Sequence, residues 1–277
     1  MTSIRTITVA GAGAKGREVA AAAARAGYRT ILEDISGQVI DLALDEIRRL
    51  AGEEALARIE PERALDRAAA EADLVIEAVP DDMETKIEVY TLLDRAAGPH
   101  CIFASATSSL SITEIASLTY RPSQVLGMHF PSNTKLLELV WGLETSHQTL
   151  AAAEQVGLRL GREVVRVKES PGLIAGRLSA LLGNEAFQML EQGVAAAADI
   201  DRAAKLGLGH PIGPLEWADQ TGLDACLDLL ERLHRSLGEK YRPAPLLAQY
   251  VKAGRLGRKT GRGVYDYGTP KRQTGKS

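Results

Sequence analysis

Residues 4–16 read IRTITVAGAGAKG, a run rich in β-branched side chains that leads into the glycine pattern GxGxxG. The pattern is a weak signal alone, but here it follows a predicted strand and opens a predicted helix, which is the context of a nucleotide site. Gly11 permits a tight turn, Gly13 lets the backbone approach a pyrophosphate, and Gly16 lets the helix pack closely on the strand. The helix N terminus also offers N–H groups and the positive end of its dipole to phosphates. We therefore predict a dinucleotide site, against the alternative of a glycine turn that binds nothing.

An acidic residue stands where such a site needs one. Asp34 ends the second predicted strand, about 20 residues beyond the glycines, where a carboxylate accepts the hydroxyls of the adenosine ribose. A carboxylate there repels a 2′-phosphate, so NAD is favoured over NADP. Glu33 precedes it, and because neighbours on a strand point to opposite faces, only one of the two faces the ribose. We assign that role to Asp34.

Two residues of the glycine motif, Ala14 and Lys15, are also assigned to the cofactor site because they open the helix whose N–H groups meet the phosphates. The Lys15 side chain is less expected at this position. It is either solvated, which is the interpretation we favour, or in contact with a phosphate.

The composition excludes several classes of protein. Hydrophobic residues make up 45% of the chain and charged residues 25%, as in soluble globular proteins, and the formal net charge of -3 gives no reason to expect nucleic acid or a membrane as partner. Cys101 and Cys226 form no CxxC motif, so neither a disulfide framework nor a metal site is expected. No apolar run approaches the roughly 20 residues that span a bilayer, and the N terminus leaves no room for a signal peptide. A reducing cytoplasm is the expected compartment.

The first half of the chain alternates short β-rich runs with alanine-rich helical stretches, which indicates βαβ units and a parallel sheet. The predicted strands cover residues 4–10, 30–33, 73–79, 101–104, 124–128, 136–140 and 164–167. The predicted helices of this half cover residues 15–26, 39–50, 53–70, 83–97, 112–118 and 149–160.

The pattern changes at residues 169–172, which read ESPG and indicate a loop. The segments predicted beyond it are helical, at residues 173–192, 197–206, 223–237 and 245–253. The predicted fold is therefore α/β, with a Rossmann dinucleotide-binding domain over residues 1–168 and an all-helical domain over residues 169–277.

Short motifs are spread over almost the whole chain. They are ASATSSL at 104–110, GMHF at 127–130, ELV at 138–140, SPG at 170–172, HPIGPL at 210–215, TGLD at 221–224 and LGRKTGRGVY at 256–265. Together they resemble the 3-hydroxyacyl-CoA dehydrogenases, in particular the short, single-function 3-hydroxybutyryl-CoA dehydrogenase type. The resemblance implies an enzyme of fatty acid metabolism that interconverts an (S)-3-hydroxyacyl thioester and the 3-oxoacyl thioester with NAD.

In that family a His–Glu pair transfers the proton, and the matching residues are His129 and Glu138. His129 ends a predicted strand, at the carboxyl edge where ligands of open α/β sheets bind. A base with a pKa near neutrality suits a hydroxyl proton that leaves together with a hydride. Glu138 would hold the ring and stabilise its charged form. The alternative for His129 is a hydrogen-bonded structural residue.

Three further residues match family positions. Ser108 matches a serine that approaches the substrate oxygen and the nicotinamide; its alternative role is the N-cap of the helix that starts at Ile112. Glu77 and Lys86 match positions near the ribose of the cofactor. For Lys86 the alternative is a solvated helix face.

The sequence departs from the family on the substrate side. In a shortened loop after His129, Ser132 stands where the family has asparagine, and Asn133 is a possible substitute. Gly176 stands at a second asparagine position, in the helix after the SPG motif. The predicted helical hairpin between Ser36 and Ala72 is shorter than the one with which the family helps hold coenzyme A. A carrier-protein-bound hydroxyacyl group, a free hydroxy acid, or a dinucleotide-binding protein with little turnover therefore stay as alternatives.

A stripe of leucines at helical spacing marks the second half of the chain, at Leu223, Leu227, Leu230 and Leu233. Such a stripe is more often core. The family also dimerises through this domain, so we predict a homodimer, with the active site in the cleft between the domains.

Overall fold

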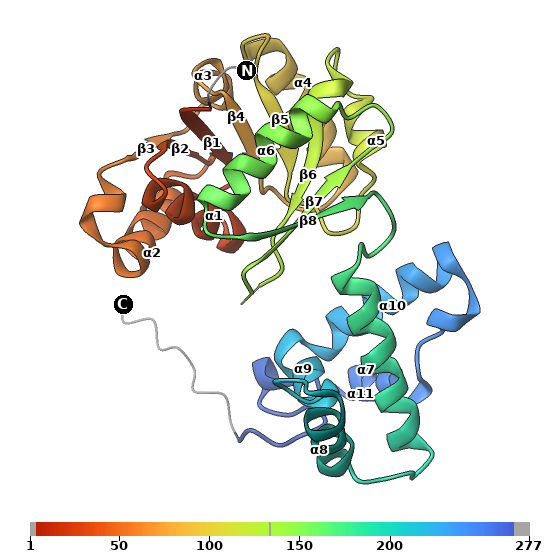
Figure 1. Cartoon of the computed structure of the whole chain (residues 1–277). Helices are drawn as coiled ribbons and strands as arrows, with labels where there is room; N and C mark the ends of the chain where they lie inside the picture. The colour runs from red at the N-terminus through yellow and green to blue at the C-terminus, as the bar shows by residue number, and fades with distance from the viewer. Residues whose placement is uncertain (1–3, 133, 269–277) are drawn as a thin grey trace. The chain divides into compact units, whose positions relative to one another are not determined.

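The computed structural model describes residues 4–132 and 134–268 of the chain (Figure 1). The chain divides into two compact units between Leu173 and Ile174. The first unit is built on a sheet and the second is helical, so the predicted α/β class, a Rossmann-like domain followed by a helical one, is confirmed. Within the described ranges, none of the helices combines the length and apolar character needed to cross a membrane.

In the described part of the first unit, eight strands form one sheet in the order β3-β2-β1-β4-β5-β6-β7-β8. The strands span Thr6–Ala10 (β1), Arg29–Glu33 (β2), Ile59–Glu62 (β3), Leu74–Glu77 (β4), Ile102–Ser105 (β5), Val125–His129 (β6), Leu136–Trp141 (β7) and Glu163–Lys168 (β8). Neighbouring strands are parallel except β6 and β7. The strand order reverses between β1 and β4, and ligands of open α/β sheets bind outside the carboxyl ends of the strands at such a point.

Helices cover both faces of this sheet (Figure 1). They span Ala14–Arg25 (α1), Gly37–Leu56 (α2), Leu65–Ala70 (α3), Met83–Ala96 (α4), Ile112–Ala116 (α5) and His147–Arg159 (α6), with a 3₁₀ turn at Pro122–Gln124 (η1). On one face α1, α2 and α6 bury side chains such as Val19 and Ile47, and on the other α3, α4 and α5 bury Tyr90 and Ile115. The central strands β1, β4 and β5 are therefore buried along their whole length, as parallel strands covered by helices are.

The segment between Ser36 and Ala72 differs from the predicted pair of helices. α2 runs to Leu56 and is interrupted at Gly52, whose φ of 80° lies in the left-handed region. Beyond it the chain forms β3 and then the short α3, so the helix predicted over residues 53–70 is wrong. β3 reads IEPE, and its proline hides a strand from pattern analysis. Pro61 is tolerated because β3 lies at the edge of the sheet.

The predicted parallel sheet has one exception, at β6 and β7. Few residues separate His129 from Leu136, whereas a parallel pair needs a crossover of roughly a dozen or more. β7 therefore returns antiparallel beside β6, and this register pairs the Cα atoms of His129 and Glu138. Parallel pairing resumes between β7 and β8, which α6 connects.

The described residues of the second unit form helices around a core of their own. The helices span Ala175–Glu191 (α7), Ala197–Leu208 (α8), Pro214–Thr221 (α9), Leu223–Leu237 (α10) and Pro245–Lys252 (α11), with 3₁₀ turns at Glu239–Tyr241 (η2) and Arg258–Thr260 (η3). α9 was not predicted because it follows a segment rich in glycine and proline, GLGHPIG at residues 207–213, although proline at a first helical position is itself a start signal. The leucines of α10 at Leu223, Leu230 and Leu233 are buried, so this stripe is core.

A buried carboxylate explains the motif LGRKTGRGVY of this unit. Asp219 accepts hydrogen bonds from the N–H groups of Val264 and Tyr265, each at 2.9 Å. A Cβ at Gly263 would lie 1.9 Å from Asp219 Oδ1, so only glycine fits this approach. The Tyr265 hydroxyl also donates to Asp201, at 2.7 Å. The motif therefore holds the second unit together.

Candidate active site

The glycine loop after β1 has the geometry of a phosphate cradle. Gly11 has a φ of 98°, and a Cβ there would lie 2.9 Å from the carbonyl oxygen of Ala78. A Cβ at Gly16 would lie 1.7 Å from the carbonyl oxygen of Gly11, so α1 can pack on the loop only without a side chain. At Gly13 a Cβ would meet nothing within 4 Å, so that backbone is open to a ligand. Since α1 begins at Ala14, its first N–H groups face the same opening, and the loop fits a dinucleotide pyrophosphate.

Asp34 joins this loop to the end of β2. Its carboxylate accepts hydrogen bonds from the backbone N–H of Ala12 at 3.0 Å and of Ser36 at 2.9 Å. A carboxylate offers about four lone-pair positions, so both oxygens retain capacity for ribose hydroxyls. Glu33, by contrast, is buried, and burial together with the charges of Asp34 and Glu62 raises its pKa to about 7.

The raised pKa of Glu33 predicts a pH-dependent stability. Between pH of about 4.5 and 7 the folded chain retains a proton that the unfolded chain releases, so the free energy of unfolding falls as pH rises through this window. A Glu33→Gln variant should lack this fall and gain about 1–3 kcal/mol at pH ~8, since one pKa unit corresponds to about 1.4 kcal/mol. Urea unfolding at pH values of about 5 and 8 measures the difference. Glu88→Gln, on the exposed side of α4, is the control. If the free energy of unfolding depends equally on pH in both variants, Glu33 is not the cause of the dependence.

Lys15 is half-buried rather than solvated, so the interpretation we favoured from sequence is wrong. Its Nζ donates a hydrogen bond to the carbonyl oxygen of Phe130, the residue after His129. Glu18 lies 3.9 Å away on the next turn of α1. Burial lowers the pKa of Lys15, Glu18 acts against this shift, and Arg162 adds to it. The first helical turn at the glycine loop therefore contacts the loop after β6.

Glu77 and Lys86 form a buried ion pair at the end of β4. Lys86 Nζ lies 2.8 Å from each carboxylate oxygen of Glu77, and both side chains are 1% exposed. The solvated alternative for Lys86 is therefore wrong. Glu77 also accepts hydrogen bonds from the Ser105 hydroxyl at 2.8 Å and from the N–H of Val79 at 2.9 Å. Because the Cα of Glu77 pairs with that of Ala10, just before the glycine loop, the ion pair braces this loop and the ends of β4 and β5.

His129 and Glu138 lie in contact at this edge. His129 Nδ1 lies 2.8 Å from Glu138 Oε2. The side chain of Glu138 is fully buried, whereas that of His129 is 17% exposed. A carboxylate at Nδ1 favours the tautomer with the proton on Nδ1, which leaves the lone pair of Nε2 to act as a base. The antiparallel register of β6 and β7 creates this contact.

Ser108 follows β5 and lines a cavity of about 280 Å³, together with Glu169 and other residues of the first unit. It is exposed, and its N–H donates to Asp81 at 3.4 Å. The N-cap of α5 is Ser111, whose hydroxyl accepts from the N–H of Glu114 at 3.1 Å, so the capping alternative for Ser108 is wrong. Glu169 accepts from the Ser111 hydroxyl at 3.0 Å and closes one side of the cavity.

The remaining predicted substrate residues belong to different parts of the chain. Ser132 is exposed in the loop after His129, and Asn133 lies outside the described residues. Gly176 belongs to the first turn of α7, in the second unit. The residues that do share one sheet edge follow or end β1, β2, β4, β5 and β6: the glycine loop, Asp34, Glu77, Ser108 and His129. The contacts of Asp81 and Glu169 were missed, because charged loop residues carry no periodic signal.

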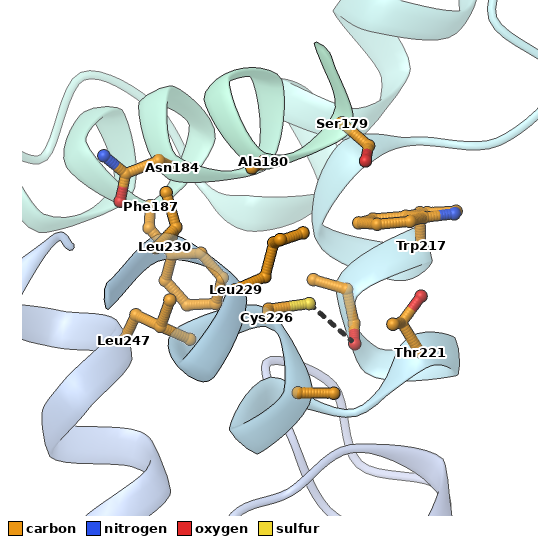
Figure 2. Close-up of a pocket in the computed structure, with 13 residues that line it drawn as sticks. Ser179, Ala180, Asn184, Phe187, Trp217, Thr221, Cys226, Leu229, Leu230 and Leu247 are labelled. Carbon is orange, nitrogen blue, oxygen red and sulfur yellow. Dashed lines mark hydrogen bonds between the residues drawn. The ribbon is translucent and has the colours of Figure 1, made fainter. Parts of the chain in front are cut away.

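Figure 2 shows a pocket in the second unit, where side chains of α7, α9 and α10 such as Phe187, Trp217 and Leu229 meet. Its volume is about 30 Å³. Burial raises the pKa of its thiol, Cys226, to about 12, so this cysteine is a poor nucleophile. The lining residues include no acid or base, and the described part of the chain holds no group of three or more His, Cys, Asp or Glu side chains suited to a metal ion. This pocket therefore offers no group suited to proton transfer.

Comparison with known proteins identifies the family. Residues 6–170 match the family model for the NAD binding domain of 3-hydroxyacyl-CoA dehydrogenase, and residues 172–267 match the model for its C-terminal domain. A probable 3-hydroxybutyryl-CoA dehydrogenase of Bacillus subtilis is 42% identical over 95% of this chain and 98% of its own length. The 3-hydroxybutyryl-CoA dehydrogenase of Bradyrhizobium diazoefficiens is 40% identical over 95% of this chain and 96% of its own.

A crystal structure supports the same family. The crystal structure of (S)-3-hydroxybutyryl-CoA dehydrogenase from Ralstonia eutropha superposes with a TM-score of 0.92 at 39% identity, over 96% of this chain and 100% of that one. The two family models together cover nearly the whole chain, and the relatives match over nearly their full length. The chain therefore belongs to the 3-hydroxyacyl-CoA dehydrogenase family, the NAD-dependent oxidoreductases that act on a CH–OH group.

Proposed function

We propose that this chain interconverts an (S)-3-hydroxyacyl-CoA and the corresponding 3-oxoacyl-CoA with NAD, using His129 and Glu138 as its acid–base pair. The observation that carries the proposal is the 2.8 Å contact between these side chains. The pair lies at the sheet edge that also carries the glycine loop and Asp34, so a base stands beside the predicted cofactor site. The names of the relatives support coenzyme A thioesters as substrates.

The proposed chemistry divides between cofactor and chain. When bound, NAD supplies the acceptor for the hydride that leaves the carbinol carbon of the substrate. His129 Nε2 takes the hydroxyl proton, and Glu138 holds the ring through Nδ1 and stabilises the imidazolium. In the reverse direction the imidazolium returns this proton to the oxygen of the 3-oxo group, so His129 acts as base and as acid.

The other site residues have supporting roles in this proposal. The backbone of residues 11–16 would hold the pyrophosphate, and Asp34 the adenosine ribose. Ser108 would donate its hydroxyl to the substrate oxygen, since it is exposed in the cavity after β5. Glu77 and Lys86 would keep the ribose side of the site in place through their buried ion pair.

A substrate panel tests the function. The protein is incubated with NAD and, separately, with 3-hydroxybutyryl-CoA, the same acyl group on a carrier protein, and free 3-hydroxybutyrate, while NADH absorbance is followed. We expect turnover of the (S)-hydroxyacyl-CoA. If only the carrier-bound acyl group or the free acid is turned over, coenzyme A is not the carrier of the acyl group in the substrate. NADH binding without any turnover would reject the enzyme and favour a dinucleotide-binding role.

A second candidate keeps the hydride chemistry and changes the substrate to a carrier-bound hydroxyacyl group or a free hydroxy acid. The feature that favours it is the polar side chains of the site: the family resemblance implies asparagine at the positions of Ser132 and Gly176, and both residues offer less hydrogen-bonding capacity. The panel assay separates this candidate from the first.

The Gly176 position offers a gain-of-function test. A Cβ there would have Leu229 as its neighbour at 3.8 Å, an ordinary contact, so Gly176→Asn fits without strain. If the substrate is an acyl-CoA, the variant should raise kcat/KM for 3-hydroxybutyryl-CoA by about 10-fold, the equivalent of one hydrogen bond in the transition state. Gly183→Asn, also on α7 with nothing within 4 Å of its Cβ, is the control. An equal response of both variants would contradict a role for position 176.

We also infer a homodimer, supported by exposed leucines on the second unit rather than by the α10 stripe. Leu178 of α7 is 66% exposed, and Leu206 and Leu208 of α8 are 77% and 65% exposed. Leu178→Glu should convert the dimer into a monomer, because a charge would be buried in an apolar interface. Light scattering measures the mass. A monomeric wild-type protein, or a dimeric variant, would contradict the inference.

The proposed function implies a cytoplasmic enzyme of fatty acid metabolism. Cys101 and Cys226 are free thiols, which supports a reducing compartment. An acyl-CoA substrate would connect the reaction to the metabolism of acyl chains. Fractionation of the source cells, followed by the assay above, tests both statements.

A further inference from the structure

Lys15 occupies a place that the proposed reaction does not use. It is the second residue of α1, in the turn that faces the pyrophosphate position, and its Nζ donates to the carbonyl oxygen of Phe130. Phe130 directly follows His129 in the chain, and its ring is buried. The side chain therefore connects the cofactor helix with the backbone next to the proposed base.

A second cation, Arg162, contacts the other end of the loop between β6 and β7. Arg162, just before β8, donates to the carbonyl oxygen of Thr134 at 2.7 Å. Its guanidinium carbon lies 5.5 Å from the centre of the Phe130 ring, and its second nitrogen donates to Glu18 at 2.8 Å. Glu18 of α1 therefore contacts Arg162 and lies 3.9 Å from Lys15. The two cations and this carboxylate form a clamp, defined as Lys15, Glu18 and Arg162, which grips Phe130 and Thr134.

We propose that Lys15 is a positioning residue, which through this clamp sets the place of the His129 ring relative to the glycine loop of the cofactor. The proposal rests on the proposed function, in which His129 is the base and the loop holds NAD. The physical reason is that both reacting partners, the hydride acceptor and the base, need a defined separation, and a misplacement of about 1 Å costs roughly 100-fold in rate. The hydrogen bond from an ammonium group to a carbonyl oxygen is charge-assisted and therefore strong enough to hold the two segments together.

The kinetic test compares Lys15→Met, which retains the side-chain length but loses the charge, with Lys15→Arg. Lys168→Met, on an exposed residue at the far end of β8, is the control. Lys15→Met should lower kcat by about 10-fold, with KM and the Kd for NADH changed less than about twofold, and Lys15→Arg should restore most of kcat. If Lys15→Met instead weakens NADH binding and leaves kcat at saturating cofactor unchanged, Lys15 is a phosphate contact and the proposal is overturned.

A second measurement tests the clamp independently of catalysis. If the wild-type protein turns over no acyl-CoA, the proposed function is rejected, but the clamp can still be tested in this way. Amide hydrogen exchange in the NADH complex should be at least about 10-fold faster in the segment after His129 in Lys15→Met than in Lys168→Met. Protection of α1 should be the same in both variants. Unchanged exchange in the segment after His129 would overturn the clamp, whatever the enzyme assay shows.

Discussion

Replacing His129 with alanine should lower kcat by roughly 10²–10⁴-fold, the usual contribution of a positioned general base. The variant removes the group whose Nδ1 contacts Glu138 and whose Nε2 would take the proton. The Kd for NADH should stay within about twofold of the wild-type value, because the ring lies at the carboxyl end of β6 rather than in the glycine loop. Stopped-flow measurement of NADH formation and a fluorescence titration of NADH provide the two quantities. Turnover at the wild-type rate would remove His129 from the mechanism.

Glu138→Gln separates the role of the carboxylate from that of the ring. An amide at this buried position still fits the space but no longer favours the imidazolium, so kcat should fall by about 10²-fold or more, with histidine still present. Combining both substitutions should cost little more than His129→Ala alone, since the two residues act as a unit. Additive losses would mean that Glu138 acts elsewhere.

Replacing Lys86 with methionine should destabilise the first unit by about 3–5 kcal/mol, because it leaves the Glu77 carboxylate buried without its cation. Both side chains are 1% exposed, so water cannot take the place of the ammonium group. The free energy of unfolding is measured with urea at neutral pH. Lys168→Met, at an exposed position, should change it by less than about 0.5 kcal/mol.

A double variant, Glu77→Gln with Lys86→Met, identifies the cause of this loss. Removing both charges should recover a large part of the stability, since the cost arises from one uncompensated charge rather than from lost packing. A double variant no more stable than Lys86→Met would show that packing around the Lys86 stem dominates.

Local chemistry made part of this molecule predictable from sequence. The glycine loop and Asp34 are recognised because each residue meets a requirement of its own backbone or carboxylate, and the neighbouring strand and helix follow from short patterns. The His–Glu pair was assigned from a resemblance. Its geometry depends on the antiparallel pairing of β7 with β6, whereas the sequence patterns predicted a parallel sheet.

What prediction missed depends on partners distant in the chain. Lys86 lies on a helix that reads METKIEVYTLLDRA and looks solvated, until Glu77 of β4 is placed beside it. Lys15 looks solvated for the same reason, because Phe130 is far away in the sequence. The edge strand β3 contains Pro61, which argues against a strand unless its edge position is known. In each case tertiary structure overrides the local pattern.

The antiparallel pairing of β6 and β7 also has a consequence for the loop between these strands. His129 and Glu138 face each other because the antiparallel register of β6 and β7 pairs their Cα atoms. A change in the loop between the strands that keeps this register would therefore alter the surface beside the two side chains and leave their contact in place. The shorter loop that the family resemblance implies for this chain would be such a change, and we expect it to affect substrate selectivity rather than the proposed proton transfer.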